Sequence, residues 1–252
     1  MQFERLDWQQ RLQHLTMMTS FMICSMTGVP IKFSHAPWTH NIVALYGGFD
    51  NMFYFHLFGA ALMLSTSLYH VVYLPLTAIM GTWTLEMAPG PKDFVNLAHT
   101  MKYFTGSRKK PANFDKYTYI EKFDYWAVFW GMVMIGLTGL MMWFPDVSAK
   151  FVPRYIIDIG RVAHSDEAVL AIIVIFIWHF YNVHMNPKFF PASTHWYDGV
   201  LPLHELKEEH PAQYAKMLEK LKYETPSVYE TLIAQDNEES GEDVTGKEDR
   251  YE

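Results

Sequence analysis

Histidine is the residue type that gives this 252-residue sequence its chemistry. Six of the twelve histidines lie within or beside long apolar segments, namely His14, His56, His70, His164, His179 and His184. Ionisable side chains inside a bilayer are costly, and they usually face other helices and serve a site. A single such histidine is as readily a hydrogen-bonded contact between helices as part of a functional site. Six together predict a functional site.

The other residue types narrow the chemistry to imidazole. Cys24 is the single cysteine, so the chain cannot ligate an iron–sulfur cluster or attach c-type haem through paired cysteines. The Glu-x-x-His pattern of di-iron helical bundles is absent. Two imidazoles, one on each face of a porphyrin, give a six-coordinate haem suited to electron transfer, because no coordination position stays open. The residue types therefore predict b-type haem.

Four apolar segments are long enough to carry these histidines through a membrane. A helix needs about 20 mostly apolar residues to cross roughly 30 Å of hydrocarbon. The segments are 13–31, 52–78, 124–145 and 163–185. We therefore predict an all-α integral membrane protein, with a bundle of four transmembrane helices over residues 1–200. We expect residues 201–252 to form a soluble acidic tail with short helices and a disordered end.

The distribution of positive charge predicts the orientation of these segments. Lys and Arg are enriched in cytoplasmic loops. Nine of them precede the first segment or lie between the second and third, against four in the other two connections. We expect a multi-pass protein of the inner (cytoplasmic) membrane, with both termini and loop 79–123 in the cytoplasm. The net charge of −7 excludes nucleic acid as an expected partner.

Helical spacing places the histidines at two depths. An α-helix turns about 100° and rises about 1.5 Å per residue. His56 and His70 are 14 residues apart, so they lie within about 40° of one face and about 21 Å apart along the axis. His164 and His179 are 15 residues apart, which gives about 60° and about 22 Å. This separation is typical of two haems stacked across one membrane.

The depths also indicate which histidines pair. His56 and His164 both lie near the outer end of their segments, and they predict an outer haem. His179 lies near the inner end, where either His14 or His70 could be its partner. Spacing alone leaves that choice open.

Four strings in the chain carry a resemblance to a known family. They are RLQHLTMMTSFMICSMTGVP, FHLFGA, KYTYIEKFDYWAVFWGMVMIGLTGLMMWFP and HSDEAVLAIIVIFIWHFYNVHMNPKFFP. They resemble the cytochrome b membrane subunit of respiratory formate dehydrogenases, and related subunits that sit beside multihaem c-type cytochromes. The similarity covers about residues 5–200 and leaves the tail unexplained. It implies a four-helix bundle of the cytochrome b type that holds two b haems.

The resemblance also implies roles for individual residues. The family's histidine pattern falls on His14, His56, His164 and His179, which favours His14 as the partner of His179. The family exchanges electrons with menaquinone or ubiquinone at an inner-side pocket near the last of these histidines. In this chain the pocket falls on residues 116–121, which include Tyr117, Thr118 and Glu121, and on His179. Thr118 departs from the family pattern, in which we expect Asn.

Two histidines are additional to that pattern. His70 and His184 both lie toward the inner face, where they could ligate a third haem, bind quinone or bond haem propionates. His184 should point about 160° away from His164 unless the helix unwinds near Pro187. Arg5, Arg11 and Arg161 are candidates for binding haem propionates, although inner-side arginines also follow from the positive-inside rule.

These patterns favour a membrane dihaem cytochrome b subunit, or a trihaem one, that moves electrons between quinone and a partner redox subunit. That partner would be a multihaem c-type cytochrome or an iron–sulfur or dehydrogenase subunit. One alternative is a haem-free membrane anchor or proton-conducting subunit that uses the same histidines. Another is a haem carrier or maturation protein with an open coordination position.

Overall fold

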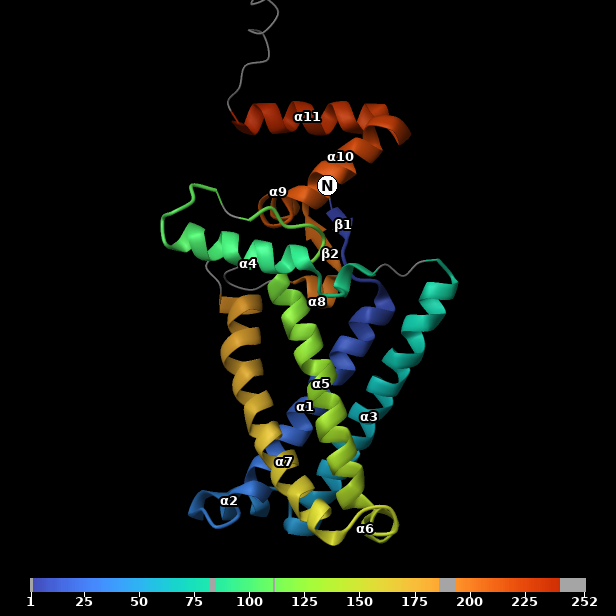
Figure 1. The fold of residues 1–252 in the computed structure, drawn as a ribbon, viewed down its shortest axis with the longest axis vertical. Coiled ribbons are helices and arrows are strands. Elements are labelled where there is room, and N and C mark those ends of the chain that lie inside the picture. The colour runs from blue at the N-terminus through green and yellow to red at the C-terminus, as the bar shows by residue number, and fades with distance from the viewer. Residues whose placement is uncertain (1, 82–84, 111, 186–193, 241–252) are drawn as a thin grey trace, which may run out of the picture. The chain divides into compact units, whose positions relative to one another are not determined.

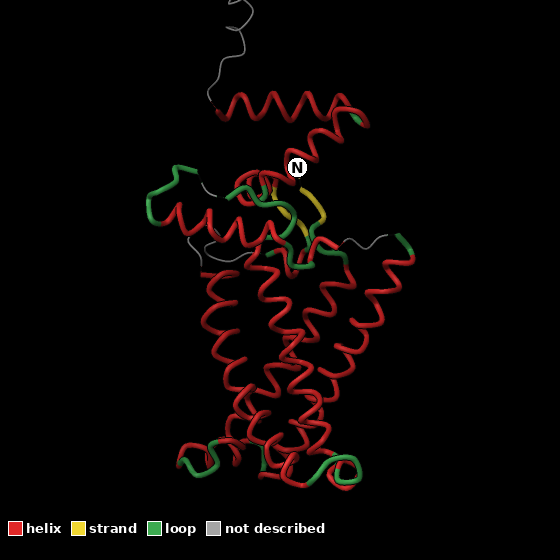
Figure 2. The backbone as a smooth tube through the Cα atoms, in the orientation of Figure 1, coloured by secondary structure: helices red, strands yellow, loops and turns green. Residues whose placement is uncertain are grey.

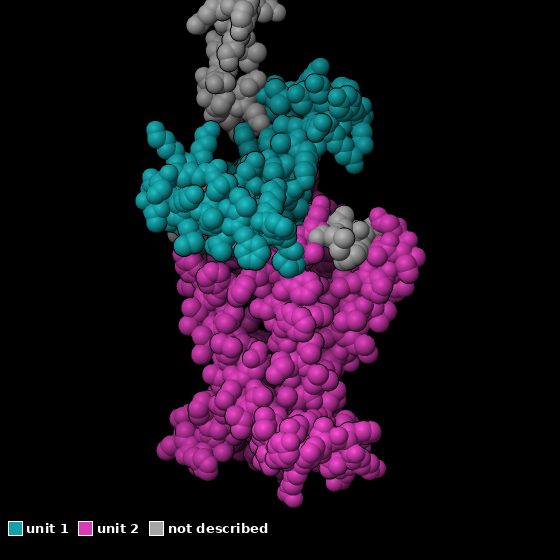
Figure 3. Space-filling model, in the orientation of Figure 1, with its two compact units in different colours: residues 1, 89–119, 202–252 teal, residues 2–88, 120–201 magenta. Residues whose placement is uncertain are grey.

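The computed structural model describes residues 2–81, 85–110, 112–185 and 194–240, which fall into two compact units. One unit, coloured magenta in Figure 3, comprises residues 2–88 and 120–201. The other comprises residues 89–119 and the chain from 202 onward. The sequence placed a boundary near residue 200, and it did not group the 89–119 segment with the tail. Each unit is described by itself below.

Long helices dominate the larger unit (Figures 1 and 2). They are α1 (Trp8–Lys32), α3 (Phe49–Ile79), α5 (Tyr119–Trp143) and α7 (Arg154–Ile173), the last continued by π-helical η2 (Val174–His179) and η3 (Tyr181–Met185). Short elements connect them: β1 (Gln2–Glu4), α2 (Pro37–Leu45), η1 (Leu85–Met87), α6 (Pro145–Ser148), α8 (His195–Asp198) and β2 (Val200–Pro202). The strands β1 and β2 pair into a two-stranded sheet. Each predicted segment lies almost entirely within one long helix.

Three helices qualify as membrane spans by length and composition among the described residues. They are Phe49–Ile79, Tyr119–Trp143 and the continuous helix Arg154–Met185. Helix α1 is 25 residues long, but its mean hydropathy is low because Gln9, Gln10, Gln13 and His14 occupy its first turns. The large apolar side chains that these long helices expose suit contact with lipid. The chain is thus a membrane protein with at least these three candidate spans.

Helix α1 begins at a capping box. The side chain of Asp7 accepts a hydrogen bond from the Gln10 backbone amide at 2.8 Å, and the Gln10 side chain accepts one from the Asp7 amide at 3.1 Å. These bonds satisfy donors that an unpaired helix end would leave open. The cap fixes where α1 starts, and so fixes the height of the residues in its first two turns.

Helices α1 and α3 cross at small residues. A Cβ atom added to Gly59 of α3 would lie 2.8 Å from Cγ2 of Ile23 and 2.9 Å from Sγ of Cys24 on α1. Ser20 and Thr27 of α1 are fully buried. Small residues let the backbones of membrane helices approach closely. This crossing therefore sets the spacing between α1 and α3.

The smaller unit is built from α4 (Pro91–Phe104), α9 (Leu203–Glu209), α10 (Pro211–Glu224) and α11 (Pro226–Ser240). Its core includes the buried side chains of Leu206, Tyr214 and Leu232. The sequence predicted short helices here but not α4, and it predicted disorder from about residue 234, where α11 continues to Ser240. Residues 241–252, the rest of that predicted disorder, lie outside the described residues.

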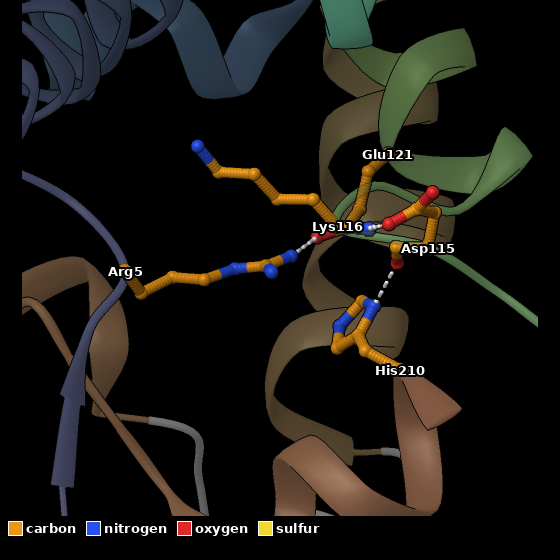
Figure 4. A network of polar contacts seen from close by, with 5 residues as sticks. All are labelled: Arg5, Asp115, Lys116, Glu121 and His210. Atoms are coloured by element: carbon orange, nitrogen blue, oxygen red, sulfur yellow. Dashed lines mark hydrogen bonds and ion pairs between the residues drawn. The ribbon is translucent and has the colours of Figure 1, made fainter. Parts of the chain in front are cut away.

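Asp115 links the 89–119 segment to the tail within this unit. Its backbone carbonyl accepts a hydrogen bond from Nδ1 of buried His210 at 2.6 Å (Figure 4). Its carboxylate is bonded by the ammonium group of Lys216. Partial burial acts to raise the pKa of Asp115, but hydrogen bonds from Lys216 and from the Lys116 amide hold that pKa below its usual value. The carboxylate therefore stays charged at neutral pH.

The Gly59 crossing yields a test of the fold. Gly59→Leu should lower the free energy of unfolding by about 1–3 kcal/mol, because overpacking forces the two backbones apart. Thermal unfolding of the purified protein in detergent measures this change. Ala61→Leu is the matched control, since Ala61 is exposed on the same helix. Equal melting temperatures for the two variants would contradict the proposed role of the crossing.

Candidate functional site

Two pairs of histidines face one another between the long helices. His56 of α3 and His164 of α7 have ring centroids 6.5 Å apart. His14 of α1 and His179 of η2 have ring centroids 6.4 Å apart. We call the first the outer pair and the second the inner pair, following the orientation predicted from the sequence. The structure thus joins His179 with His14, one of the two partners that spacing had left open.

Thr27 holds the ring of His56 in the outer pair. Its hydroxyl donates to the carbonyl of Ile23 at 2.7 Å, so its oxygen accepts from Nδ1 of His56 at 2.9 Å. The Nδ1 atom then carries the proton, and Nε2 keeps its lone pair. A neutral imidazole in this tautomer can ligate a metal through Nε2.

Thr138 holds the ring of His164 in the same way. Its hydroxyl donates to the carbonyl of Met134 at 2.6 Å and lies 3.2 Å from Nδ1 of His164. The Ile135 carbonyl, which can only accept, lies 3.1 Å from the same nitrogen. Nδ1 of His164 is therefore the protonated nitrogen. Both outer histidines present Nε2 as a lone-pair donor.

A glycine follows each of these threonines and makes room for the ring. A Cβ atom on Gly28 would lie 3.2 Å from Cε1 of His56, and one on Gly139 would lie 3.1 Å from Cε1 of His164. Both distances are tighter than ordinary van der Waals contact. The Thr-Gly step thus fixes each imidazole by one hydrogen bond and one close contact.

A carboxylate orients His179 in the inner pair. Oδ2 of Asp124 on α5 lies 3.2 Å from Nδ1 of His179. A carboxylate accepts a hydrogen bond, so Nδ1 of His179 carries a proton, and Nε2 lies on the side of the ring away from Asp124. The inner pair therefore differs from the outer one in having a charged partner.

The geometry of both pairs fits haem iron. A bond from a metal to an imidazole nitrogen is about 2 Å and the nitrogen lies about 1.2 Å from its ring centre, so two imidazoles on opposite sides of one iron have centroids about 6.4 Å apart. The described residues contain no group of three or more His, Cys, Asp or Glu side chains that could hold a bare metal ion. Haem needs only two protein ligands, since the porphyrin supplies four nitrogens.

The two additional histidines lie in separate places. His70 is bonded at both ring nitrogens, Nδ1 to Oε1 of Gln13 at 2.7 Å and Nε2 to the hydroxyl of Tyr125 at 2.8 Å. His184 contacts the rings of Phe180 and Trp196. Within the described residues no contact joins His70 to His184.

The π-helical segments change the angular expectation for α7. A π-helix bonds residue i to i+5, so each residue turns less than in an α-helix. The α-helical arithmetic that turned His184 away from the site therefore does not hold beyond Val174. Pro187, to which the sequence assigned such unwinding, lies outside the described residues. Single π-turns are frequent at functional sites.

The predicted propionate arginines have different surroundings. Arg5 forms an ion pair with Glu121 at 2.7 Å, and its side chain is 7% exposed (Figure 4). Arg11 donates to the backbone carbonyls of Tyr197 at 2.9 Å and Asp198 at 3.1 Å. Arg161 is exposed. The geometry gives none of them a contact with either histidine pair.

Asp198 is a charged neighbour of Arg11. Hydrogen bonds from the side chain of Thr194 and from the Val200 amide lower the pKa of Asp198. Gly199 follows it with a φ of +77°, and an added Cβ would lie 2.5 Å from the Leu6 carbonyl. The Arg11 contacts thus fasten the start of α1 to the 194–201 segment.

The predicted quinone residues belong to one stretch of chain. The loop residues Tyr117 and Thr118 lie in the smaller unit, where Nζ of Lys116 sits 5.3 Å from the ring centre of Tyr117. Glu121 lies in the first turn of α5 and pairs with Arg5. Of these candidates, Glu121 is the one whose partner the structure identifies within the larger unit.

Sequence reasoning missed the residues that orient the rings. It gave no role in orienting a ring to the Thr27-Gly28 and Thr138-Gly139 steps, to Asp124 or to Gln13. The available signal was the depth of each Thr-Gly step, which matches the depth of a histidine on the following long helix. Asp124 offered a second signal, because carboxylates within a span are rare.

Comparison with known proteins identifies the family of this chain. No curated protein matches the chain significantly. The family model described as prokaryotic cytochrome b561 matches residues 5–194, which include all four long helices and both histidine pairs. The chain therefore belongs to the prokaryotic cytochrome b561 family, a family of membrane b-type cytochromes of electron transfer.

Proposed function

We propose that this chain is a dihaem cytochrome b subunit that moves electrons across the membrane between quinone and a partner redox subunit. The observation that carries the proposal is the spacing of the two histidine pairs, 6.5 and 6.4 Å between ring centroids. When bound, each haem would supply reversible one-electron chemistry between ferric and ferrous iron.

The residues of the chain have three tasks in this function. Nε2 of His56 and His164 would hold one iron, and Nε2 of His14 and His179 the other. Thr27, Thr138 and Asp124 would fix the ring orientations through Nδ1. The helices would exclude water and hold the two sites at two depths, because His164 and His179 lie 15 residues apart on the continuous helix Arg154–Met185.

Helix α1 is the proposed fourth span. It carries His14 of the inner pair and Thr27 of the outer pair, so it must run past both sites. Its length of 25 residues is sufficient to cross a bilayer. Its polar early turns would lie in the interfacial region, and positive charge in loop 79–123 supports cytoplasmic termini at the inner membrane.

The outside partners are also part of the proposal. Resemblance to formate dehydrogenase subunits supports menaquinone or ubiquinone as the substrate at the inner end of the bundle. One cysteine cannot hold an iron–sulfur cluster, so a multihaem c-type cytochrome or a dehydrogenase subunit would supply the remaining redox centres.

Haem content tests the proposal directly. We expect two b haems per chain in a pyridine haemochrome assay, one of them lost in His56→Ala and the other in His179→Ala, because each variant leaves an iron with one protein ligand. His204→Ala is the control, since that side chain is 71% exposed. His70→Ala should keep both haems. A colourless wild-type protein would favour the haem-free proton-conducting alternative.

The threonines yield a second test, read as a redox potential. An acceptor on Nδ1 makes an imidazole a stronger donor to ferric iron, so its removal should raise the potential of the outer haem. Loss of one hydrogen bond of about 1 kcal/mol corresponds to about 40 mV for one electron. Spectroelectrochemical titration of Thr27→Val should show this rise with an unchanged inner haem. Thr138→Val should show a smaller rise, because the Ile135 carbonyl still accepts from Nδ1 of His164.

Thr19→Val is the matched control for these threonine variants. The Thr19 hydroxyl bonds the Leu15 carbonyl of its own helix at 2.9 Å and has no contact with a histidine. Its potentials should equal those of the wild type. Identical potentials in all three threonine variants would show that Thr27 and Thr138 do not orient the ligands.

A further inference from the structure

The two helical hairpins of the larger unit repeat one arrangement. In α1 and α3, a Thr-Gly step on the first helix holds His56 on the second. In α5 and α7, another Thr-Gly step holds His164. Thr138 lies 111 residues after Thr27, and His164 lies 108 residues after His56. These two offsets relate the first hairpin to the second.

The repeated arrangement extends to individual bonds. Thr27 and Thr138 each bond the carbonyl four residues before them, Ile23 at 2.7 Å and Met134 at 2.6 Å. Each also lies 3.3 Å from the carbonyl three residues before, Cys24 or Ile135. The following glycine supports Cε1 of the imidazole at 3.2 or 3.1 Å. Close packing alone does not require all of these matches.

The same offsets relate residues at the inner end. The offset of 111 residues takes His14 on α1 to Tyr125 on α5, and the offset of 108 takes His70 on α3 to Trp178, one residue before His179. The π-helical η2, Val174–His179, begins between His164, which matches His56, and Trp178, which the offset matches to His70. Each π-helical bond spans one residue more than an α-helical bond. His179 is thus the counterpart of His70.

The inner pair therefore has a second copy in the fold. His14 and His179 join α1 to α7, and Tyr125 and His70 join α5 to α3. The hydroxyl of Tyr125 lies 2.8 Å from Nε2 of His70. Two ligand atoms on opposite sides of one iron must lie about 4 Å apart, since each bond is about 2 Å. This second pair is too close to hold haem and offers hydrogen bonds instead.

Gln13 completes the second pair. Its Oε1 accepts from Nδ1 of His70 at 2.7 Å, so Nε2 of His70 accepts from the Tyr125 hydroxyl. Nε2 of Gln13 is buried and has no hydrogen-bond partner among the described residues. The cluster thus holds one unused buried donor, Nε2 of Gln13, beside a hydrogen bond from a hydroxyl to an imidazole that a ligand with both functions can replace. Gln13 also precedes His14, so the cluster adjoins the inner pair.

We propose that His70, Tyr125 and Gln13 bind the headgroup of an isoprenoid quinone. One quinone carbonyl would accept from Nε2 of Gln13, and the other would replace His70 as the acceptor of the Tyr125 hydroxyl. In the quinol form, the hydroxyl at that second oxygen would donate to Nε2 of His70. His70 and Tyr125 lie on two of the candidate spans, and exposed Leu68, Val71 and Val72 lie on the helix of His70, where a lipid-soluble ligand arrives. This inference rests on the proposed function and assigns the headgroup to side chains of α1, α3 and α5 instead of the loop residues 117–121.

Photolabelling tests where the headgroup binds. The haem-loaded protein is irradiated with an azido-substituted short-tail quinone, and labelled peptides are mapped by mass spectrometry. We expect label in the peptides that contain His70 or Tyr125, reduced by excess unlabelled quinone. Label confined to residues 117–121, or label that excess quinone does not displace, would overturn the inference.

Quinol kinetics separate this inference from the proposed function. Tyr125→Phe should raise the KM for haem reduction by a short-tail quinol about tenfold, as expected for one lost hydrogen bond. Tyr69→Phe is the matched control, because the exposed Tyr69 bonds Gln9 and not the cluster. Haem content and reduction by dithionite should be unchanged in both variants.

The two failures give different results. If dithionite but not quinol reduces the wild-type haems, quinone is not the substrate and the proposed function falls along with the inference. If quinol reduces the wild type and both tyrosine variants with equal KM, the proposed function stands and the cluster is only a structural hydrogen bond.

Discussion

An imidazole inside a bilayer must have a defined partner for its protonated nitrogen, and the larger unit is arranged around that requirement. A threonine serves His56, a threonine and a carbonyl serve His164, and a carboxylate serves His179. Each partner accepts a hydrogen bond from Nδ1, which keeps the proton on that nitrogen and leaves Nε2 with its lone pair for a metal. The choice of tautomer thus comes before any metal binds. Without these partners each neutral ring would exchange tautomers, and no fixed ligand geometry would exist.

The same requirement explains where the helices come close. A threonine reaches the ring of a neighbouring helix only if little else lies between them, so a glycine follows it at Gly28 and Gly139. The crossing at Gly59 sets the approach of α1 to α3 in the same way. Asp124 differs from the threonines because it brings a negative charge to the inner pair. The two sites of the proposed dihaem chain would therefore have unequal potentials, the inner one lowered by the carboxylate.

Much of this organisation was predictable, and the remainder depended on local backbone geometry. The apolar segments at 52–78, 124–145 and 163–185 predicted helices, because hydropathy alone specifies a buried or lipid-facing run. The depth of His56 and His164 predicted that they pair. Spacing could not decide between His14 and His70, since both lie at the depth of His179. The π-helical segments after Ile173 carry no sequence signature, so the α-helical arithmetic used for the angle of His184 does not apply to that part of the helix. Tyr125 and Gln13 went unnoticed because they have neither charge nor metal-ligand chemistry.

The relation between the two hairpins accounts for the number of sites. The outer pair joins α3 to α7, the second helix of each hairpin. If the two hairpins exchange places, α3 takes the position of α7 and α7 that of α3, so the outer pair maps onto itself. The fold therefore provides one outer site. The inner pair joins α1 to α7, and the exchange turns it into α5 with α3, so the fold provides two inner positions. At one of them His14 faces His179 across 6.4 Å, and at the other Tyr125 bonds His70 directly. The two inner positions are unequal because one has a tyrosine in place of a histidine and because π-helical η2 shifts the match by one residue, from Trp178 to His179. A chain with this geometry has ligands for two haems and leaves the third position to a ligand that binds through hydrogen bonds.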